Sequence, residues 1–266
     1  MRDIAAPLTS AWRVIAPDLR GHGDSDNTGS YAMAQFVADL KALYDHFGLS
    51  DAVLVGHSLG GHIVTRFAGI WPACVSGLII IDGMGPPRAG EAISSEMMQE
   101  GWRRGVEGLL GLRHAPRQMA DREEALARLT RNNPKLSPSL AAAIVDDGIE
   151  AHPGGGVCWK WDSRVQMVWN TFDHDETERM CQFVSCPVLL VTGEHSMDYW
   201  MGIREFDPVD IKVLHDESNR RRVRLFRDAR HVEIPGAGHM IHYDQPERLN
   251  DEIAAFLAAS PAGPHP

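Results

Sequence analysis

A serine on a glycine-rich corner is the residue of this sequence most clearly set up for chemistry. Ser58 lies in the stretch GHSLG at residues 56–60, between an apolar run that ends at Val55 and a helix-period segment. A serine on so tight a turn projects its hydroxyl from a strand end, and the next amide, that of Leu59, opens a helix and faces charge on an attacked carbonyl. Glycines two positions before and after Ser58 should relieve crowding there. We expect a nucleophilic serine with Leu59 as an oxyanion donor.

Such a serine needs a base within hydrogen-bond distance, because its hydroxyl is a poor nucleophile near neutral pH. His239 is the best candidate: it lies in IPGAGHMIHYD, where a strand ends and a glycine-containing loop leads to the last helix. His242, three residues later, is the competitor. The side chain of His57 should diverge from that of Ser58, and we expect it to line the substrate pocket.

Three stretches together resemble the α/β-hydrolase superfamily, in its branch with a helical cap: the corner at 56–60, GAGH at 236–239 and VIAPDLRGHGDSD at 14–26. The pair NP at 133–134 and GGGVCWKWD at 154–162 are similar, more narrowly, to the serine hydrolase-like group. The resemblance implies a triad in the chain order Ser, acid, His. It also implies cleavage of an ester, lactone or related acyl substrate through an acyl-enzyme, with no cofactor.

The acid of this triad departs from the family pattern. Relatives usually carry it three residues after the glycine that ends the strand, where this sequence has Ser196, and the first carboxylate after that is Asp198. The acid must hold the tautomer of His239 and stabilise its charged form, so we expect a shifted loop to bring Asp198 into place. Asp82, at the end of the preceding strand, is the alternative acid. The remaining options are Asp207, Asp210 or no acid at all.

The start of the chain is a second departure. Such proteins normally begin with further strands and an H-G loop that gives a second oxyanion amide, whereas this sequence opens at MRDIAAPLTSAWRVIAPD. We expect a truncated or misassigned start, with direct pairing of the strands at 12–16 and 52–55 as the other option. Loss of one oxyanion donor costs about 10²- to 10³-fold in turnover. A catalytically weak or inactive ligand-binding protein is therefore one alternative function, and a C–C bond hydrolase with the same triad is another.

The elements that must position these residues alternate between apolar runs and helix-period segments, which indicates parallel strands joined by helical crossovers. The pattern predicts an α/β fold, a mostly parallel sheet with flanking helices, and the resemblance implies that residues 1–83 and 187–266 are the α/β-hydrolase core. About five strands are recognisable, at 12–16, 52–55, 77–81, 187–192 and 231–234, with helices at 33–47, 59–70 and 245–259. In DLRGHGDS, the residues Asp18, Gly21 and Gly23 should shape a turn beside the site.

Residues 84–186 break this rhythm and are predicted to form a helical cap over the carboxyl ends of the strands. Helical segments are expected at 96–110, 122–130 and 139–148, with a glycine turn at 154–156. Trp159 and Trp161 of this region would suit an apolar acyl group, and we expect them in the substrate pocket.

Composition narrows the classes of partner. The 266 residues carry 26 Lys and Arg against 36 Asp and Glu, a formal charge of −10, which argues against a nucleic-acid partner. No apolar stretch approaches the roughly 20 residues of a membrane-spanning helix. We expect a small-molecule acyl substrate as the partner and leave the oligomeric state open.

Three further patterns receive structural interpretations. Cys74, Cys158, Cys181 and Cys186 show no CxxC spacing, which favours inert thiols in a reducing cytoplasm. The groups DHDE at 173–176 and HD at 215–216 are expected on solvated loops, with no metal. The basic run at 220–222 is expected on a solvated helix face.

Overall fold

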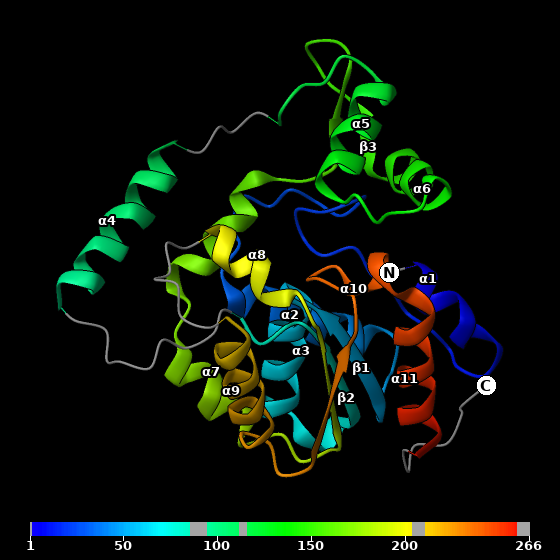
Figure 1. Ribbon diagram of the computed structural model, residues 1–266, viewed down its shortest axis with the longest axis vertical. Coiled ribbons are helices and arrows are strands. Elements are labelled where there is room, and N and C mark those ends of the chain that lie inside the picture. Colours follow the sequence, from blue (N-terminus) through cyan, green and yellow to red (C-terminus); the bar gives the residue numbers. More distant parts are fainter. Residues whose placement is uncertain (1, 86–94, 112–115, 204–210, 260–266) are drawn as a thin grey trace. The chain divides into compact units, whose positions relative to one another are not determined.

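The computed structural model describes residues 2–85, 95–111, 116–203 and 211–259 (Figure 1). The chain divides into two compact units, which we call the sheet unit and the helical unit. The sheet unit comprises residues 1–16, 37–89 and 173–266, and the helical unit comprises residues 17–36 and 90–172. The stretch 17–36, assigned to the core from the sequence, thus groups with the helical unit.

The sheet unit holds four strands: β1 (Ala52–His57), β2 (Val75–Ile81), β5 (Val188–Gly193) and β6 (Ala229–Ile234). Its α-helices are α1 (Arg2–Ala5), the greater part of α2 (Met33–His46), α3 (Leu59–Ile70), α7 (His174–Cys181), α8 (Ser196–Ile203), α9 (Ile211–Val223), α10 (Ile241–Asp244) and α11 (Pro246–Ala259). Two 3₁₀ helices, η1 (Ala6–Ser10) and η2 (Pro72–Cys74), complete it.

The four strands form one parallel sheet in the order β1-β2-β5-β6. Four of the predicted strands are confirmed, but the strand predicted at 12–16 is wrong. Residues 13–16 belong to no strand, while Trp12 packs against the apolar core. Among the described residues β1 pairs with β2 alone, so residues 12–16 have no ladder partner in this sheet.

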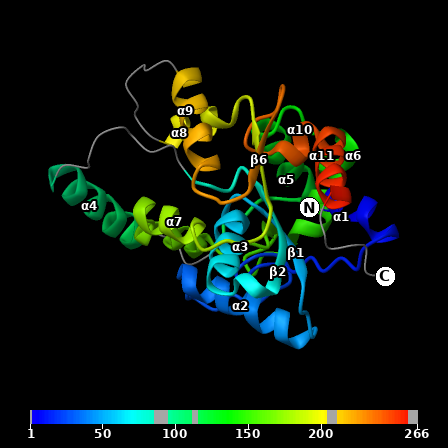
Figure 2. The ribbon, with the colours of Figure 1, turned by 90° about the horizontal axis from the view of Figure 1, so that it is seen from below.

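Helices cover both faces of this sheet (Figure 2), as the uniformly apolar strands predict. Successive side chains of a strand point to opposite faces. Ile79 and Ile81 of β2 share a core cluster with Ile253 of α11. On the other face α3 packs against β1 and β2, and Gly61 comes close to Ile80.

The corner between β1 and α3 is sterically tight at only one of the two glycines singled out in the sequence. A Cβ on Gly56 would lie 2.3 Å from the carbonyl oxygen of Gly60, which only glycine avoids. A Cβ on Gly60 would meet nothing within 4 Å outside its own helix in the described part of the chain. The expectation of crowding at Gly60 is therefore wrong, because a side chain there has open space beside it. Gly61 is the second tight position, since a Cβ there would lie 2.6 Å from Cα of Gly83.

The helical unit contains α4 (Ser95–Gly111), α5 (Arg122–Asn132), α6 (Pro138–Gly148) and the 3₁₀ helix η3 (Ser163–Thr171). The three predicted helices are confirmed, but the antiparallel hairpin β3 (Ile149–Ala151) and β4 (Val157–Trp159) was not predicted. Met119, Ala125 and Val145 form a small core, and Trp159 packs against it.

The turn predicted in DLRGHGDS forms within the helical unit. The carboxylate of Asp18 accepts the amide of Asp24 at 3.0 Å, and Gly21 and Gly23 both have positive φ. Nearby, the hydroxyl of Tyr31 donates to Asp162 at 2.6 Å. The turn is thus a structural element of this unit.

The structure bears on two predictions about the chain, those for its cysteines and for membrane-spanning helices. All four cysteines are free thiols, and burial raises the pKa of Cys181 to about 12 and that of Cys186 to about 11. None of the helices in the described ranges has the length and hydropathy that a membrane crossing requires.

The two glycines of the corner give a matched test of the packing. We expect Gly56→Ala to lower the free energy of unfolding by about 1–3 kcal/mol or more, because the new methyl group meets backbone atoms. Gly60→Ala should be neutral or raise it by up to about 1 kcal/mol, since alanine favours the helix. Urea unfolding of both variants checks this, and equal destabilisation would contradict it.

Candidate active site

Ser58 sits at the sharp turn that joins β1 to α3, in a strained backbone conformation. Its φ is 51° and its ψ is −117°, and its amide donates to the carbonyl of Ile81 at 3.0 Å. Asp82, with φ 44°, is the other non-glycine residue with positive φ in the described part of the chain. Such conformations cost of order 1–3 kcal/mol each and cluster at functional sites. Both strained residues lie at the carboxyl ends of neighbouring strands.

His239 reaches Ser58 from the loop that follows β6. Its Nε2 lies 3.0 Å from Oγ of Ser58. The loop crosses the end of β5 so closely that a Cβ on Gly193 would lie 2.4 Å from the carbonyl oxygen of Ala237. The amide of Gly238 donates to the carboxylate of Asp244 at 2.7 Å, which fixes the backbone next to His239. The predicted meeting of serine and histidine is therefore present.

The carboxylate beside His239 belongs to Asp82. Its Oδ2 lies 2.6 Å from Nδ1 of His239, and both side chains are buried. Asp82 directly follows β2, which lies between β1 and β5, so this strand end is next to that of Ser58. The alternative named from the sequence is the one that the geometry supports.

The expectation for Asp198 is not met. α8 begins at Ser196, and the helix leaves the Asp198 side chain exposed. Ser196, at the family's customary acid position, is buried, and its Oγ accepts the amide of Gly193 at 2.8 Å. The serine therefore closes the turn after β5. Asp207 and Asp210, the further options, lie outside the described residues.

The amide of Leu59 is the first of α3. The first amides of a helix have no acceptor within it, and they carry the positive end of its dipole. The role of Leu59 as an oxyanion donor stays a prediction.

Two more histidines pack around the site. The Nε2 of His57 donates to the carbonyl oxygen of His239 at 2.8 Å, and its ring centre lies 4.7 Å from that of His242. Burial, followed by the charge of His239, lowers the pKa of His57 to about 4. His57 thus diverges from Ser58 and supports the His239 backbone, while its pocket role stays a prediction.

His242, the competing base, packs against His57 and is buried. Within the described residues its Nδ1 is buried without a hydrogen-bond partner. Burial lowers the pKa of His242 to about 2, so its ring is neutral in the folded protein.

Tyr199 and Arg222 are site neighbours that the sequence did not identify. The ring of Tyr199 on α8 stacks on His239, with centroids 4.1 Å apart and planes 15° apart.

Arg222 of α9 lines, together with Asp82, a cavity of only about 10 Å³. Its guanidinium donates to the carbonyl of Gly85 at 2.5 Å. Burial lowers the pKa of Arg222. The predicted solvated face at 220–222 therefore holds for exposed Arg220 and Arg221 but is wrong for Arg222.

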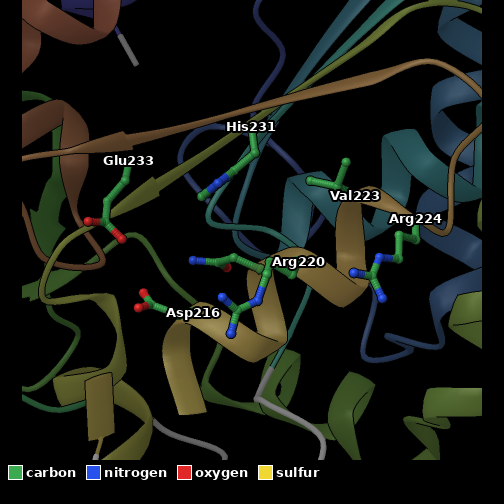
Figure 3. A pocket seen from close by; sticks show the side chains of 7 residues that line it. Asp216, Arg220, Val223, Arg224, His231 and Glu233 are labelled. Carbon is green, nitrogen blue, oxygen red and sulfur yellow. The ribbon is translucent and has the colours of Figure 1, made fainter. Parts of the chain in front are cut away.

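A larger pocket of about 570 Å³ lies between α9 and β6, and Figure 3 shows Asp216 and Glu233 among its lining residues. The solvated loop predicted for 215–216 is wrong, because His215 is buried on α9. His215 lies 3.2 Å from Glu233 through Nδ1 and 3.1 Å from Asn219 through Nε2. Both of its ring nitrogens are thus engaged in a polar network, and the absence of a metal stays a prediction.

The loop predicted at 173–176 is a helix start. Asp173 caps α7, with its carboxylate accepting the amide of Glu176 at 3.0 Å.

In the helical unit, Trp161 is partly exposed and Trp159 packs on that unit's core. Their pocket role also stays a prediction.

A family comparison matches this architecture. The sequence model described as "Alpha/beta hydrolase family" matches residues 2–252. The chain belongs to this family. The predicted α/β-hydrolase fold is thereby confirmed.

Relatives of this α/β hydrolase include the "Serine hydrolase-like protein" of Danio rerio, 24% identical over 94% of the chain and 74% of the relative. The "sn-1-specific diacylglycerol lipase ABHD11" of Mus musculus is 25% identical over 92% of the chain and 72% of the relative. Among solved structures, the "Thioesterase Domain From Curacin Biosynthetic Pathway" is similar with a TM-score of 0.75 and 24% identity, over 96% of this chain and 85% of that one. This structural likeness shows the fold.

The neutral burial of His242 predicts a pH dependence of stability. Its folded pKa of about 2 lies below the ordinary value of 6.5, so the unfolded chain binds the extra proton as pH falls below 6.5. Between pH 6.5 and about 2, the histidine thus lowers the free energy of unfolding by about 1.4 kcal/mol for each unit by which the pH falls. In His242→Leu, proton uptake on unfolding at pH 5–6, measured from urea midpoints against pH, should fall by about one. An unchanged slope would contradict the assignment.

Proposed function

We propose that this α/β hydrolase is a serine hydrolase that cleaves a small or medium acyl ester or lactone through an acyl-enzyme. The observation that carries the proposal is one continuous line of contacts. Ser58 Oγ lies 3.0 Å from His239 Nε2, and His239 Nδ1 lies 2.6 Å from Asp82. A nucleophile, its base and a group that orients the base are the parts that acyl transfer needs.

In the proposed reaction, Oγ of Ser58 attacks the acyl carbon while Nε2 of His239 takes the hydroxyl proton. Negative charge moves to the carbonyl oxygen, where the amide of Leu59 stabilises it. The imidazolium then gives its proton to the leaving alcohol, and a water activated by the same imidazole releases the acid. No cofactor takes part in these steps.

Asp82 has two tasks in this proposal. Its carboxylate accepts Nδ1–H of His239, which leaves Nε2 free to take the serine proton. Its negative charge also stabilises the imidazolium, and the interaction is strong because both side chains are buried. Asp82 therefore replaces Asp198 as the acid that we propose.

The substrate class rests on the site and on the relatives. The names "Serine hydrolase-like protein" and "sn-1-specific diacylglycerol lipase ABHD11" both denote serine or ester chemistry in those proteins. We therefore propose a small-molecule acyl substrate as the partner. The compartment that we propose is the cytoplasm.

Removal of the nucleophile tests the proposal. Wild type should react with an active-site fluorophosphonate and turn over short p-nitrophenyl esters, while Ser58→Ala should lose labelling and at least about 10³-fold in kcat. Mass spectrometry of the labelled peptide locates the adduct.

Circular dichroism and the urea midpoint serve as controls for folding of the variant. A folded wild type that is unlabelled, and that hydrolyses esters no faster than Ser58→Ala, would overturn the proposal. That result would favour a ligand-binding protein without catalysis.

The identity of the acid is tested with two matched amide variants. Asp82→Asn should lower kcat by about 10³- to 10⁴-fold, since an asparagine there favours the wrong tautomer of His239, and KM should change little. Asp198→Asn should change kcat by less than about threefold, because Asp198 is exposed on α8. Steady-state kinetics with one ester compares them, and the reverse pattern would restore Asp198 as the acid.

A further inference from the structure

The face of the His239 ring carries a contact that the proposed triad does not use. Tyr199 stacks on this ring with centroids 4.1 Å apart and an interplanar angle of 15°. We propose that Tyr199 is a positioning residue whose aromatic face stabilises the imidazolium that His239 becomes during acyl transfer. The inference rests on the proposed function.

The elements around the site explain why Tyr199 occupies this place. The turn after β5 is closed by the buried Ser196, and α8 begins there. Tyr199 follows one helical turn later and lies over the imidazole, whereas Asp198 is directed to solvent. The segment that carries the acid in the family pattern thus delivers an aromatic ring to the same histidine.

The contacts of His239 differ in geometry around its ring. Nε2 is directed at Ser58 and Nδ1 at Asp82, so the edges of the ring are occupied. His57 makes a tilted contact, with centroids 4.9 Å apart and planes 42° apart. Tyr199, with planes 15° apart, makes a near-parallel contact. Burial and then the charge of Asp82 raise the pKa of the Tyr199 phenol, which agrees with a ring held close to the acid.

The charge changes in the reaction decide what the stack contributes. As the bond from Ser58 Oγ to the acyl carbon forms, the hydroxyl proton moves to Nε2 and the carbonyl π electrons move to oxygen. His239 gains one positive charge while Asp82 stays negative. The face of an aromatic ring is negative and attracts a cation more strongly than a neutral imidazole. Only this difference between transition state and ground state raises kcat.

The test compares the loss of the ring at position 199 with changes to its electrons that keep its shape. Tyr199→Leu removes the aromatic face and should lower the acylation rate by about 3- to 30-fold. Tyr199→Phe restores the face, and we expect a rate within about threefold of wild type. Phenylalanines with one, two and three ring fluorines, incorporated at the same position, have progressively weaker negative faces. The logarithm of the rate should fall stepwise with each fluorine.

The readout is the pre-steady-state burst of p-nitrophenolate, which reports acylation of Ser58. The dissociation constant of the ester, taken from the dependence of the burst rate on ester concentration, and the thermal midpoint should stay near those of Tyr199→Phe throughout the fluorinated series, because the ring still fills its place. A purely packing role would give equal rates across that series, since fluorine changes the ring's electrons more than its volume. Equal rates in the fluorinated series, or equal rates in Tyr199→Leu and Tyr199→Phe, would overturn the proposal.

Failure of this inference and failure of the proposed function look different. If fluorophosphonate labels wild type at Ser58 and the fluorine series is flat, only the role of Tyr199 is lost. If wild type is neither labelled nor active on esters, the proposed function falls, and the role of Tyr199 falls with it.

Discussion

The contact between His239 and Asp82 is the interaction on which the site depends. Both side chains are buried, and their closest atoms are 2.6 Å apart. A buried carboxylate is costly unless it is hydrogen-bonded and paired, and the imidazole supplies that partner. The same contact fixes which nitrogen faces Ser58. Stability and the proposed reactivity therefore share one hydrogen bond.

That contact joins parts of the chain that are distant in sequence. Ser58 and Asp82 directly follow β1 and β2, and His239 lies in the loop after β6; parallel strands place all these strand ends at one edge of the sheet. The turns at Ser58 and Asp82 both adopt positive φ, which only tight surroundings maintain. Gly56 and Gly61 provide these surroundings by admitting backbone where any side chain would collide. The strain is thus held by packing within the sheet unit.

The sequence predicted the elements of this edge well and its details less well. Strong periodicity gave α3 and the buried strands, and the turn chemistry gave Ser58 and His239. The sequence favours Asp198 over Asp82 because the family pattern places the acid in the loop after β5, whereas the contact of Asp82 with His239 requires knowledge that β2 lies between β1 and β5. Tyr199 and Arg222 depend on how α8 and α9 orient their side chains, which no local pattern encodes. The strand expected at 12–16 failed because a strand needs a hydrogen-bonding neighbour, and local propensity does not supply one.

The most direct test of the account is a crystal structure of the protein after reaction with a fluorophosphonate. The account predicts phosphorus bonded to Oγ of Ser58, a phosphonyl oxygen within hydrogen-bond distance of the Leu59 amide, and Asp82 on Nδ1 of His239. An adduct on another residue, or a His239 whose Nδ1 is paired with a different carboxylate, would contradict it.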